Sequence, residues 1–114
     1  TVSLRGGFEQ QKSCLVFHFI GQLDAYSEKQ FMEYVVDVLK ASNLPAVIDL
    51  SKIDFLDSSG LGALVQLAKQ CTDAKRAFSL VGNSRVMQTV KLVRLEEFLH
   101  LAQDLPSALS NLAA

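Results

Sequence analysis

Hydrophobic residues change their spacing several times along this chain, and each change predicts a new element. Residues 14–20 (CLVFHFI) are almost continuously apolar, which is typical of a β-strand covered on both faces, and Gly21 is predicted to close that strand. The more polar residues 3–10 predict an edge strand, joined to the next strand by a turn near residues 11–13. Further buried strands are predicted over residues 46–50 and 77–81, and the position of residues 100–101 suggests a last, very short strand.

Between these strands the hydrophobic spacing becomes helical. Residues 27–41 predict an amphipathic helix, with Ser27 as its N-cap and Asn43 and Pro45 ending it. Further helices are predicted over residues 59–72, over residues 84–93 and from residue 104 onward. The predicted inward-facing residues of the first, second and last helices are, in turn, Phe31, Val35, Val38 and Leu39; Leu61, Leu64, Val65 and Ala68; and Leu105, Ala108, Leu109 and Leu112.

The order of elements is therefore two strands followed by alternating helices and strands. This order predicts an α/β fold with a mixed sheet of four or five strands, right-handed crossovers and about four helices packed mainly on one face. The chain has 114 residues and contains no linker, repeat or low-complexity tract. We expect a single domain over residues 1–114, long enough to bury a core without disulfides.

Composition and charge exclude several classes of protein. Hydrophobic residues make up 49% of the chain and charged residues 20%, which is typical of a soluble globular protein. The net charge is −1 and the basic residues are scattered, so the sequence shows no electrostatic footprint for nucleic acid or an anionic membrane, and neither is predicted as a partner. No apolar run approaches the roughly 18 residues of a membrane span, and the N-terminus lacks a basic-then-apolar signal, so we expect a cytoplasmic protein without membrane insertion. Because the sequence starts at Thr1, we expect that an initiator methionine was removed or that residues are missing.

The two cysteines, Cys14 and Cys71, lie far apart and form no Cys-x-x-Cys pair. No clustered histidines complete a zinc site with them, so neither a metal nor a cofactor is predicted. We expect both to be buried, reduced thiols. His18 lies between two phenylalanines of a predicted strand and is expected to be structural, and Asp49 is expected to turn outward or to be hydrogen-bonded locally.

The most informative segment is residues 54–64 (DFLDSSGLGAL), where an apolar strand gives way to a helix. Two hydroxyls stand beside a carboxylate at the helix start, whose free N–H groups and partial positive charge suit an anionic group such as a phosphate. Gly60 and Gly62 each cost about 0.5–1 kcal/mol of helix stability relative to alanine, so something must approach the backbone closely there. We interpret this segment as a phosphorylatable docking surface.

Each candidate residue also has a simpler role. Asp57 and Ser58 could only cap the helix, which is the more common role of an arbitrary Asp-Ser-Ser-Gly. Ser59 is expected to be a helix-start residue, with phosphorylation there as the alternative to Ser58. Asp24, after the first buried strand, could fix a turn or contact a partner. The glycine pair, together with a matching upstream motif, favours the docking interpretation here.

Two motifs in register carry a resemblance to a known family. Gly21-Gln-Leu-Asp24 and Asp57-Ser-Ser-Gly-Leu-Gly62, with the order of elements around them, resemble the STAS domain of bacterial anti-sigma factor antagonists over essentially the whole chain. The sequence departs from the family pattern at two places. Ser27 stands where a threonine often opens the first helix, which changes little because serine also caps. Residues 93–97 lack the glycine often seen there, which leaves the end of the third helix less defined.

The resemblance implies a partner switch without catalysis by this chain. The unmodified protein would bind an anti-sigma factor that is also a serine kinase of the histidine-kinase-like ATPase fold. That kinase would phosphorylate Ser58, the complex would separate, and a PP2C-type phosphatase would restore the hydroxyl. A homodimer is compatible with this scheme. The implied contact patch consists of Asp24, Tyr26, Ser27, Asp57, Ser58, Ser59, Gly60 and Leu61.

Three other functions compete with this one. A response-regulator receiver could use Asp57 as phosphoacceptor, but it needs an acidic pair after its first strand and a lysine after its last, and neither is present. A serine hydrolase needs a Gly-x-Ser-x-Gly elbow and a base, and the sequence around Ser58 is not such an elbow. The serious alternative is a STAS scaffold in a stress-signalling or lipid-transport complex, in which Ser58 is never modified.

Overall fold

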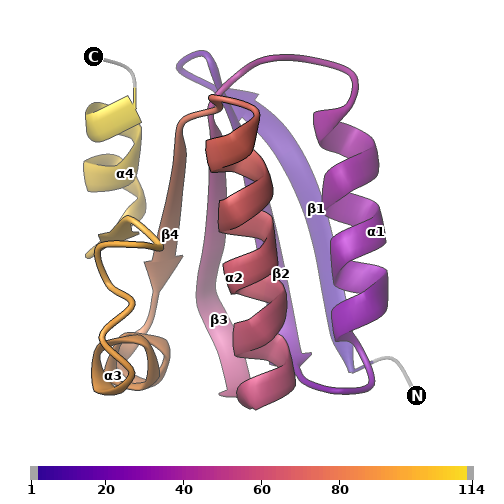
Figure 1. Ribbon diagram of the computed structural model, residues 1–114, viewed down its shortest axis with the longest axis vertical. Coiled ribbons are helices and arrows are strands. Elements are labelled where there is room, and N and C mark those ends of the chain that lie inside the picture. Colours follow the sequence, from indigo (N-terminus) through magenta and orange to yellow (C-terminus); the bar gives the residue numbers. More distant parts are fainter. Residues whose placement is uncertain (1–2, 113–114) are drawn as a thin grey trace.

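A mixed five-stranded sheet forms the centre of the protein, with four helices packed against it (Figure 1). The computed structural model describes residues 3–112. The strands are β1 (Leu4–Gln11), β2 (Cys14–Leu23), β3 (Ala46–Leu56), β4 (Phe78–Gly82) and β5 (Leu101–Ala102). The helices are α1 (Glu28–Leu39), α2 (Ser58–Asp73), α3 (Ser84–Leu92) and α4 (Leu105–Leu112).

The strands lie in the sheet in the order in which they follow one another along the chain. β1 pairs with β2 in antiparallel fashion across a tight turn, and every later neighbouring pair is parallel. Parallel neighbours need a crossover, and α1, α2 and α3 supply it between successive strands. The predicted α/β fold class is confirmed, including the short last strand.

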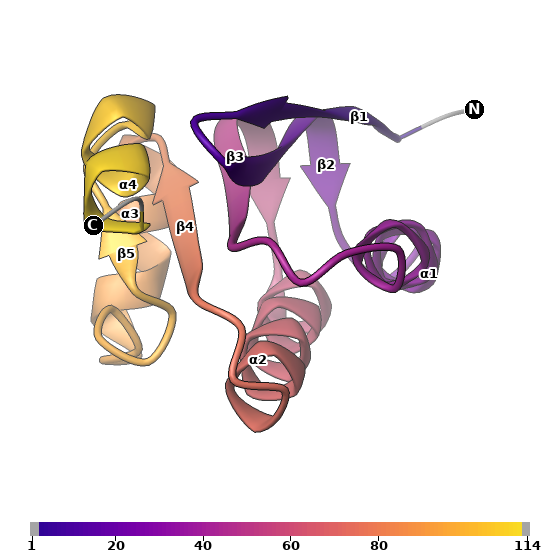
Figure 2. The ribbon, with the colours of Figure 1, turned by 90° about the horizontal axis from the view of Figure 1, so that it is seen from above.

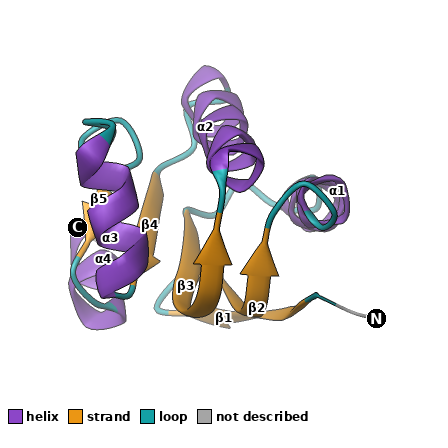
Figure 3. Ribbon diagram, turned by 90° about the horizontal axis from the view of Figure 1, so that it is seen from below, coloured by secondary structure: helices purple, strands orange, loops and turns teal. Residues whose placement is uncertain are grey.

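Alternation along the strands divides the core into two layers. Phe17, Ile48 and Leu80 face one side of the sheet, where α1, α2 and α3 cover them. Val47 and Val81 face the other side, where α4 packs. Figures 2 and 3 show the result, with α1 and α2 together on one side of the sheet and α4 at the β4–β5 end.

β2 and β3 are both longer than predicted. β2 continues through Gly21 to Leu23, and β3 continues past Leu50 to Leu56, so the predicted ends at these two positions are wrong. Gly21 continues the strand in a left-handed conformation, φ +116°, and a Cβ there would overlap the carbonyl oxygen of Ser3. The register between the two strands shifts on either side of this glycine, which explains why simple alternation does not reveal the extension.

The buried face of α2 differs from the predicted one. Leu64 and Ala68 are buried as expected, whereas Leu61 and Val65 are only half-buried. The other buried residues of this helix are Gly60, Ala63, Leu67 and Cys71. The helix is therefore turned so that its first turn presents Gly60 to the sheet, for a reason given below.

The connection between α3 and β5 contains no glycine. α3 ends at Leu92, close to the predicted end, and Arg94 takes φ +61° in the following turn. A non-glycine residue rarely adopts this conformation, yet here it takes the position for which a glycine was expected. The missing glycine therefore does not prevent the chain from turning toward β5.

His18 joins three strands on the part of the sheet that α4 does not cover. Its Nδ1 lies 3.0 Å from Oδ2 of Asp49, and its Nε2 lies 3.1 Å from Oε1 of Glu9. Asp49 Oδ1 also accepts a hydrogen bond of 3.0 Å from the Ser51 amide, which confirms the predicted local hydrogen bonding of Asp49. His18 thus links β1, β2 and β3 across the sheet.

Both cysteines are free and buried, as predicted. Cys14 belongs to the core layer under α4, whereas Cys71 belongs to the layer under α2, so the sheet separates the two thiols. Burial raises the pKa of both thiols, with the nearby Arg76 opposing this shift at Cys71. Raised pKa values keep both side chains in the unreactive thiol form near neutral pH.

Candidate functional site

The two sequence motifs meet at one edge of the sheet. Leu23, the last residue of β2, pairs with Leu56, the last residue of β3. Asp24 directly follows β2 and Asp57 directly follows β3. The loop before α1 and the start of α2 therefore lie side by side, near the bottom of Figure 1, where both helices begin. The amide of Asp57 donates to the carbonyl of Leu23 at 3.4 Å, which joins the two segments.

Asp57 caps α2. Its backbone is extended, with φ −104° and ψ −173°, and its Oδ1 accepts a hydrogen bond of 2.9 Å from the Gly60 amide. This geometry satisfies one of the free N–H groups of the first turn. The capping role considered for Asp57 is therefore confirmed, and its carboxylate is fixed beside the two serines that follow.

Ser58 and Ser59 differ in their access to solvent. Ser58 is the first residue of α2 and is exposed, and its hydroxyl makes no hydrogen bond to any residue between 3 and 112. Ser59 is half-buried. An enzyme that modifies one of these hydroxyls from outside can reach that of Ser58 more directly.

Gly60 and Gly62 have different surroundings, although they lie in the same helical turn. Gly60 is buried, and a Cβ there would overlap the carbonyl oxygen of Leu23 and lie 2.9 Å from Cδ1 of Leu56. The close approach to Gly60 is thus made by the chain itself, where α2 packs on the end of β2. Gly62 is exposed, and a Cβ there would meet no described atom within 4 Å apart from the adjoining backbone of its own helix.

Asp24 and Ser27 form a closed set of hydrogen bonds in the loop between β2 and α1. Oδ1 of Asp24 accepts from the amides of Tyr26 and Ser27 at 2.9 and 3.1 Å. The Ser27 hydroxyl accepts from the Asp24 amide at 3.0 Å and donates to the carbonyl of Gln22 at 2.8 Å. Asp24 therefore fixes the turn, which is one of the two roles considered for it.

The loop holds its polar side chains inward and one aromatic side chain outward. Ser27 stands at the N-cap position of α1, but its hydroxyl makes no cap hydrogen bond and instead points back to β2. Asp24 and Ser27 are buried, at 7% and 3% exposure, whereas Tyr26 is 92% exposed. Asp57 and Leu61 are half-buried. Within the predicted contact patch, Tyr26 and Ser58 are thus the side chains most open to another molecule.

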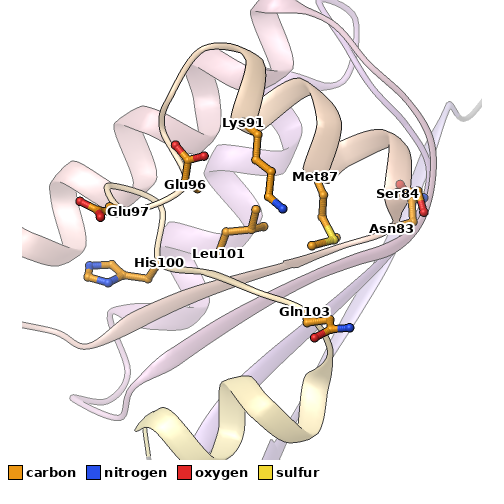
Figure 4. A pocket seen from close by; sticks show the side chains of 10 residues that line it. Asn83, Ser84, Met87, Lys91, Glu96, Glu97, His100, Leu101 and Gln103 are labelled. Atoms are coloured by element: carbon orange, nitrogen blue, oxygen red, sulfur yellow. The ribbon is translucent and has the colours of Figure 1, made fainter.

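A hollow in the described structure lies elsewhere. It has a volume of about 1130 Å³ and lies between α3 and the segment that leads into β5 (Figure 4). Lys91, Glu96, Glu97 and His100 line it beside Met87 and other residues. The sequence did not predict this hollow, no residue of the predicted contact patch lines it, and its lining of both charge signs selects no ligand class.

Between residues 3 and 112 no three His, Cys, Asp or Glu side chains are placed to hold a metal ion. Of the helices over the same residues, none has the length and apolar character to cross a membrane.

Removing the Asp57 cap should weaken the fold moderately. We expect Asp57→Ala to lower the free energy of unfolding by about 1 kcal/mol, because the Gly60 amide loses its acceptor. Urea denaturation of the purified protein measures this change. Asp57→Asn is the matched control, because its side-chain oxygen can accept the same hydrogen bond. Equal losses in both variants would contradict the capping role.

Comparison with known proteins adds a family to this geometry. The sequence model of the STAS domain family matches residues 8–108, which is most of the chain. The matched region includes both motifs and every strand except the first part of β1.

Solved structures share the fold at low sequence identity. An anti-sigma factor antagonist from Mycobacterium paratuberculosis is 24% identical, with a TM-score of 0.81 and coverage of 98% of this chain and 96% of that one. The anti-sigma factor antagonist SpoIIAA in its unphosphorylated form is 16% identical, with a TM-score of 0.68 and coverage of 88% and 90%. A murine anion transporter of the solute carrier 26 family is 15% identical, with a TM-score of 0.76, and the match covers 90% of this chain but 18% of the transporter.

Proposed function

The chain belongs to the STAS domain family, and on this basis we propose that it is an anti-sigma factor antagonist controlled by phosphorylation of Ser58. In this proposal the unmodified protein binds an anti-sigma factor that is also a serine kinase of the histidine-kinase-like ATPase fold. The kinase transfers phosphate to Ser58, and the complex separates. A PP2C-type phosphatase then restores the hydroxyl and with it the capacity to bind.

The observation that carries the proposal is the free hydroxyl of Ser58 on the first residue of α2. It is exposed, and the capping Asp57 precedes it. A phosphate at a helix N-terminus interacts favourably with the helix dipole, typically by about 0.3–1 kcal/mol. The fold should therefore tolerate the modified residue, and the effect of the phosphate should fall on whatever binds this surface.

Two solved structures of the same fold support the proposed role. One is described as an anti-sigma factor antagonist, and the other, SpoIIAA, is described as being in its unphosphorylated form. In this role the chain is the substrate of a kinase and carries out no catalysis itself. Because sigma factors act on RNA polymerase inside bacterial cells, we propose that this protein acts in the cytoplasm.

Phosphorylation in vitro tests the proposal. We expect incubation of the purified chain with ATP and the histidine-kinase-like serine kinases of its own genome to add one phosphate, located on Ser58 by mass spectrometry. Ser58→Ala should abolish the incorporation and Ser59→Ala should leave it. Phosphate on Ser59 would overturn the site assignment, and no incorporation with any of these kinases would contradict the phosphorylation switch.

One observation favours a second candidate function. The match to the transporter covers 18% of that much longer chain, so the same fold can also be one part of a longer protein. The alternative for this chain is a scaffold, in a stress-signalling or lipid-transport complex, that is never phosphorylated. The scaffold would be favoured if binding partners have equal affinity for the wild type and for Ser58→Glu and if no phosphate is incorporated.

A further inference from the structure

Gly62 has no role within the described fold that requires a glycine. A side chain there would point into open space, since no described atom outside the adjoining backbone of α2 lies within 4 Å of its Cβ position. Its backbone takes the ordinary conformation of α2, so no positive φ demands glycine either. Alanine would make this helix more stable at the same position. Gly60, two residues earlier, differs because α2 packs there on Leu23.

The position of Gly62 relates it to the proposed phosphorylation site. Gly62 follows Ser58 by four residues in α2, so the two lie on the same face of the helix. Cβ positions four residues apart in a helix are separated by about 5–6 Å. Both are exposed. An enzyme that transfers phosphate to the Ser58 hydroxyl must cover the surface around it, and Gly62 lies within one helical turn of that hydroxyl.

We infer that Gly62 is a contact residue for the serine kinase. The main chain of the kinase packs directly against the start of α2, because the glycine has no side chain to hold it away. This inference rests on the proposed function, because it assigns the kinase to the surface around Ser58. Tyr26 flanks this surface, since its loop begins next to Leu23, on whose carbonyl the first turn of α2 packs. Its ring is 92% exposed, and exposed aromatic side chains are frequent anchors at protein interfaces.

A methyl group added at Gly62 should stabilise the fold but weaken binding of the kinase. We expect Gly62→Ala to raise the melting temperature by about 2–5 °C, because alanine favours the helix. The same variant should bind the kinase about tenfold more weakly and be phosphorylated about tenfold more slowly at low substrate concentration. The reason is that an added methyl group in a closely packed contact forces the two surfaces apart.

Thr72→Ala is the matched control, because Thr72 is exposed near the other end of α2 and alanine again favours the helix. It should melt higher but bind and be phosphorylated like the wild type. The probes are ATP and the histidine-kinase-like serine kinases of the same genome, with affinity measured by calorimetry in the presence of ADP and kcat/KM measured by phosphate incorporation.

The outcomes separate this inference from the proposed function. If the wild type is phosphorylated on Ser58 and Gly62→Ala is bound and phosphorylated equally well, the inference is wrong and the proposed function stands. A melting temperature that falls in Gly62→Ala would assign the glycine an internal role and would also overturn the inference. If the wild type is not phosphorylated by any of these kinases, both fail.

Discussion

Replacing Ser58 by glutamate is expected to weaken binding of the proposed anti-sigma factor partner by roughly a thousandfold while the fold stays intact. The glutamate places a negative charge on an exposed position at the start of α2, which a helix N-terminus accommodates. In a complex packed against this turn, the same charge would be removed from water without a cation to pair with it. Such burial costs several kcal/mol, and about 1.4 kcal/mol corresponds to a tenfold change in affinity.

The acidic neighbour Asp57 should add to this loss of affinity. The carboxylate of Asp57 is held at the same helix start by the Gly60 amide, so a second negative charge beside it increases the repulsion against any acidic surface that approaches. No rearrangement of the fold is needed for this mechanism, because the charge acts at the contact surface itself. Circular dichroism and the melting temperature of Ser58→Glu should therefore remain close to those of the wild type.

Two control variants separate charge from size. Ser58→Gln has nearly the same shape as the glutamate variant but no charge, and it should bind much more tightly than Ser58→Glu. Ser58→Ala should bind the anti-sigma factor like the wild type and should not be released by ATP. Calorimetric titration of each variant with the anti-sigma factor measures these affinities. Equal affinity of Ser58→Glu and the wild type would end the interpretation of Ser58 as a switch.

Hydrophobic spacing predicts the order of elements and the fold class, because burial against a sheet imposes a period that the residues must follow. The same spacing does not reveal that β3 continues to Leu56. The residues after Leu50 include Ser51, Lys52 and Asp54, which resemble a polar turn, and the register shift near Gly21 breaks the alternation. Strand pairing extends this segment, and pairing partners cannot be inferred from the local sequence alone.

The candidate site shows a similar division. A cap at Asp57 and hydroxyls at the helix start follow from local chemistry, since Asp-Ser-Ser-Gly after an apolar strand is a helix N-terminus signal. The helix begins at Ser58, one residue before the predicted start at Ser59. That the Ser27 hydroxyl turns back to the carbonyl of Gln22 depends on how β2 ends, which the sequence does not specify. The different surroundings of Gly60 and Gly62 depend on the rotation of α2 against the sheet.

Replacing Gly60 by alanine is expected to lower the free energy of unfolding by about 2–3 kcal/mol. The added Cβ would overlap the carbonyl oxygen of Leu23, a main-chain atom in a paired strand that cannot rotate away as a flexible side chain can. It would also lie 2.9 Å from Cδ1 of the buried Leu56. The intrinsic preference of a helix for alanine over glycine, about 0.5–1 kcal/mol, offsets only part of this strain.

The neighbouring glycine provides the comparison that makes this test specific. Gly62→Ala introduces the same methyl group into the same turn of α2, at a position that no other described part of the protein approaches within 4 Å. It should raise the free energy of unfolding by about 0.5–1 kcal/mol. Urea denaturation of both variants under identical conditions measures the difference between them. If Gly60→Ala were as stable as Gly62→Ala, α2 would not pack directly on the end of β2, and the placement of Ser58 beside the loop of Asp24 would have to be revised.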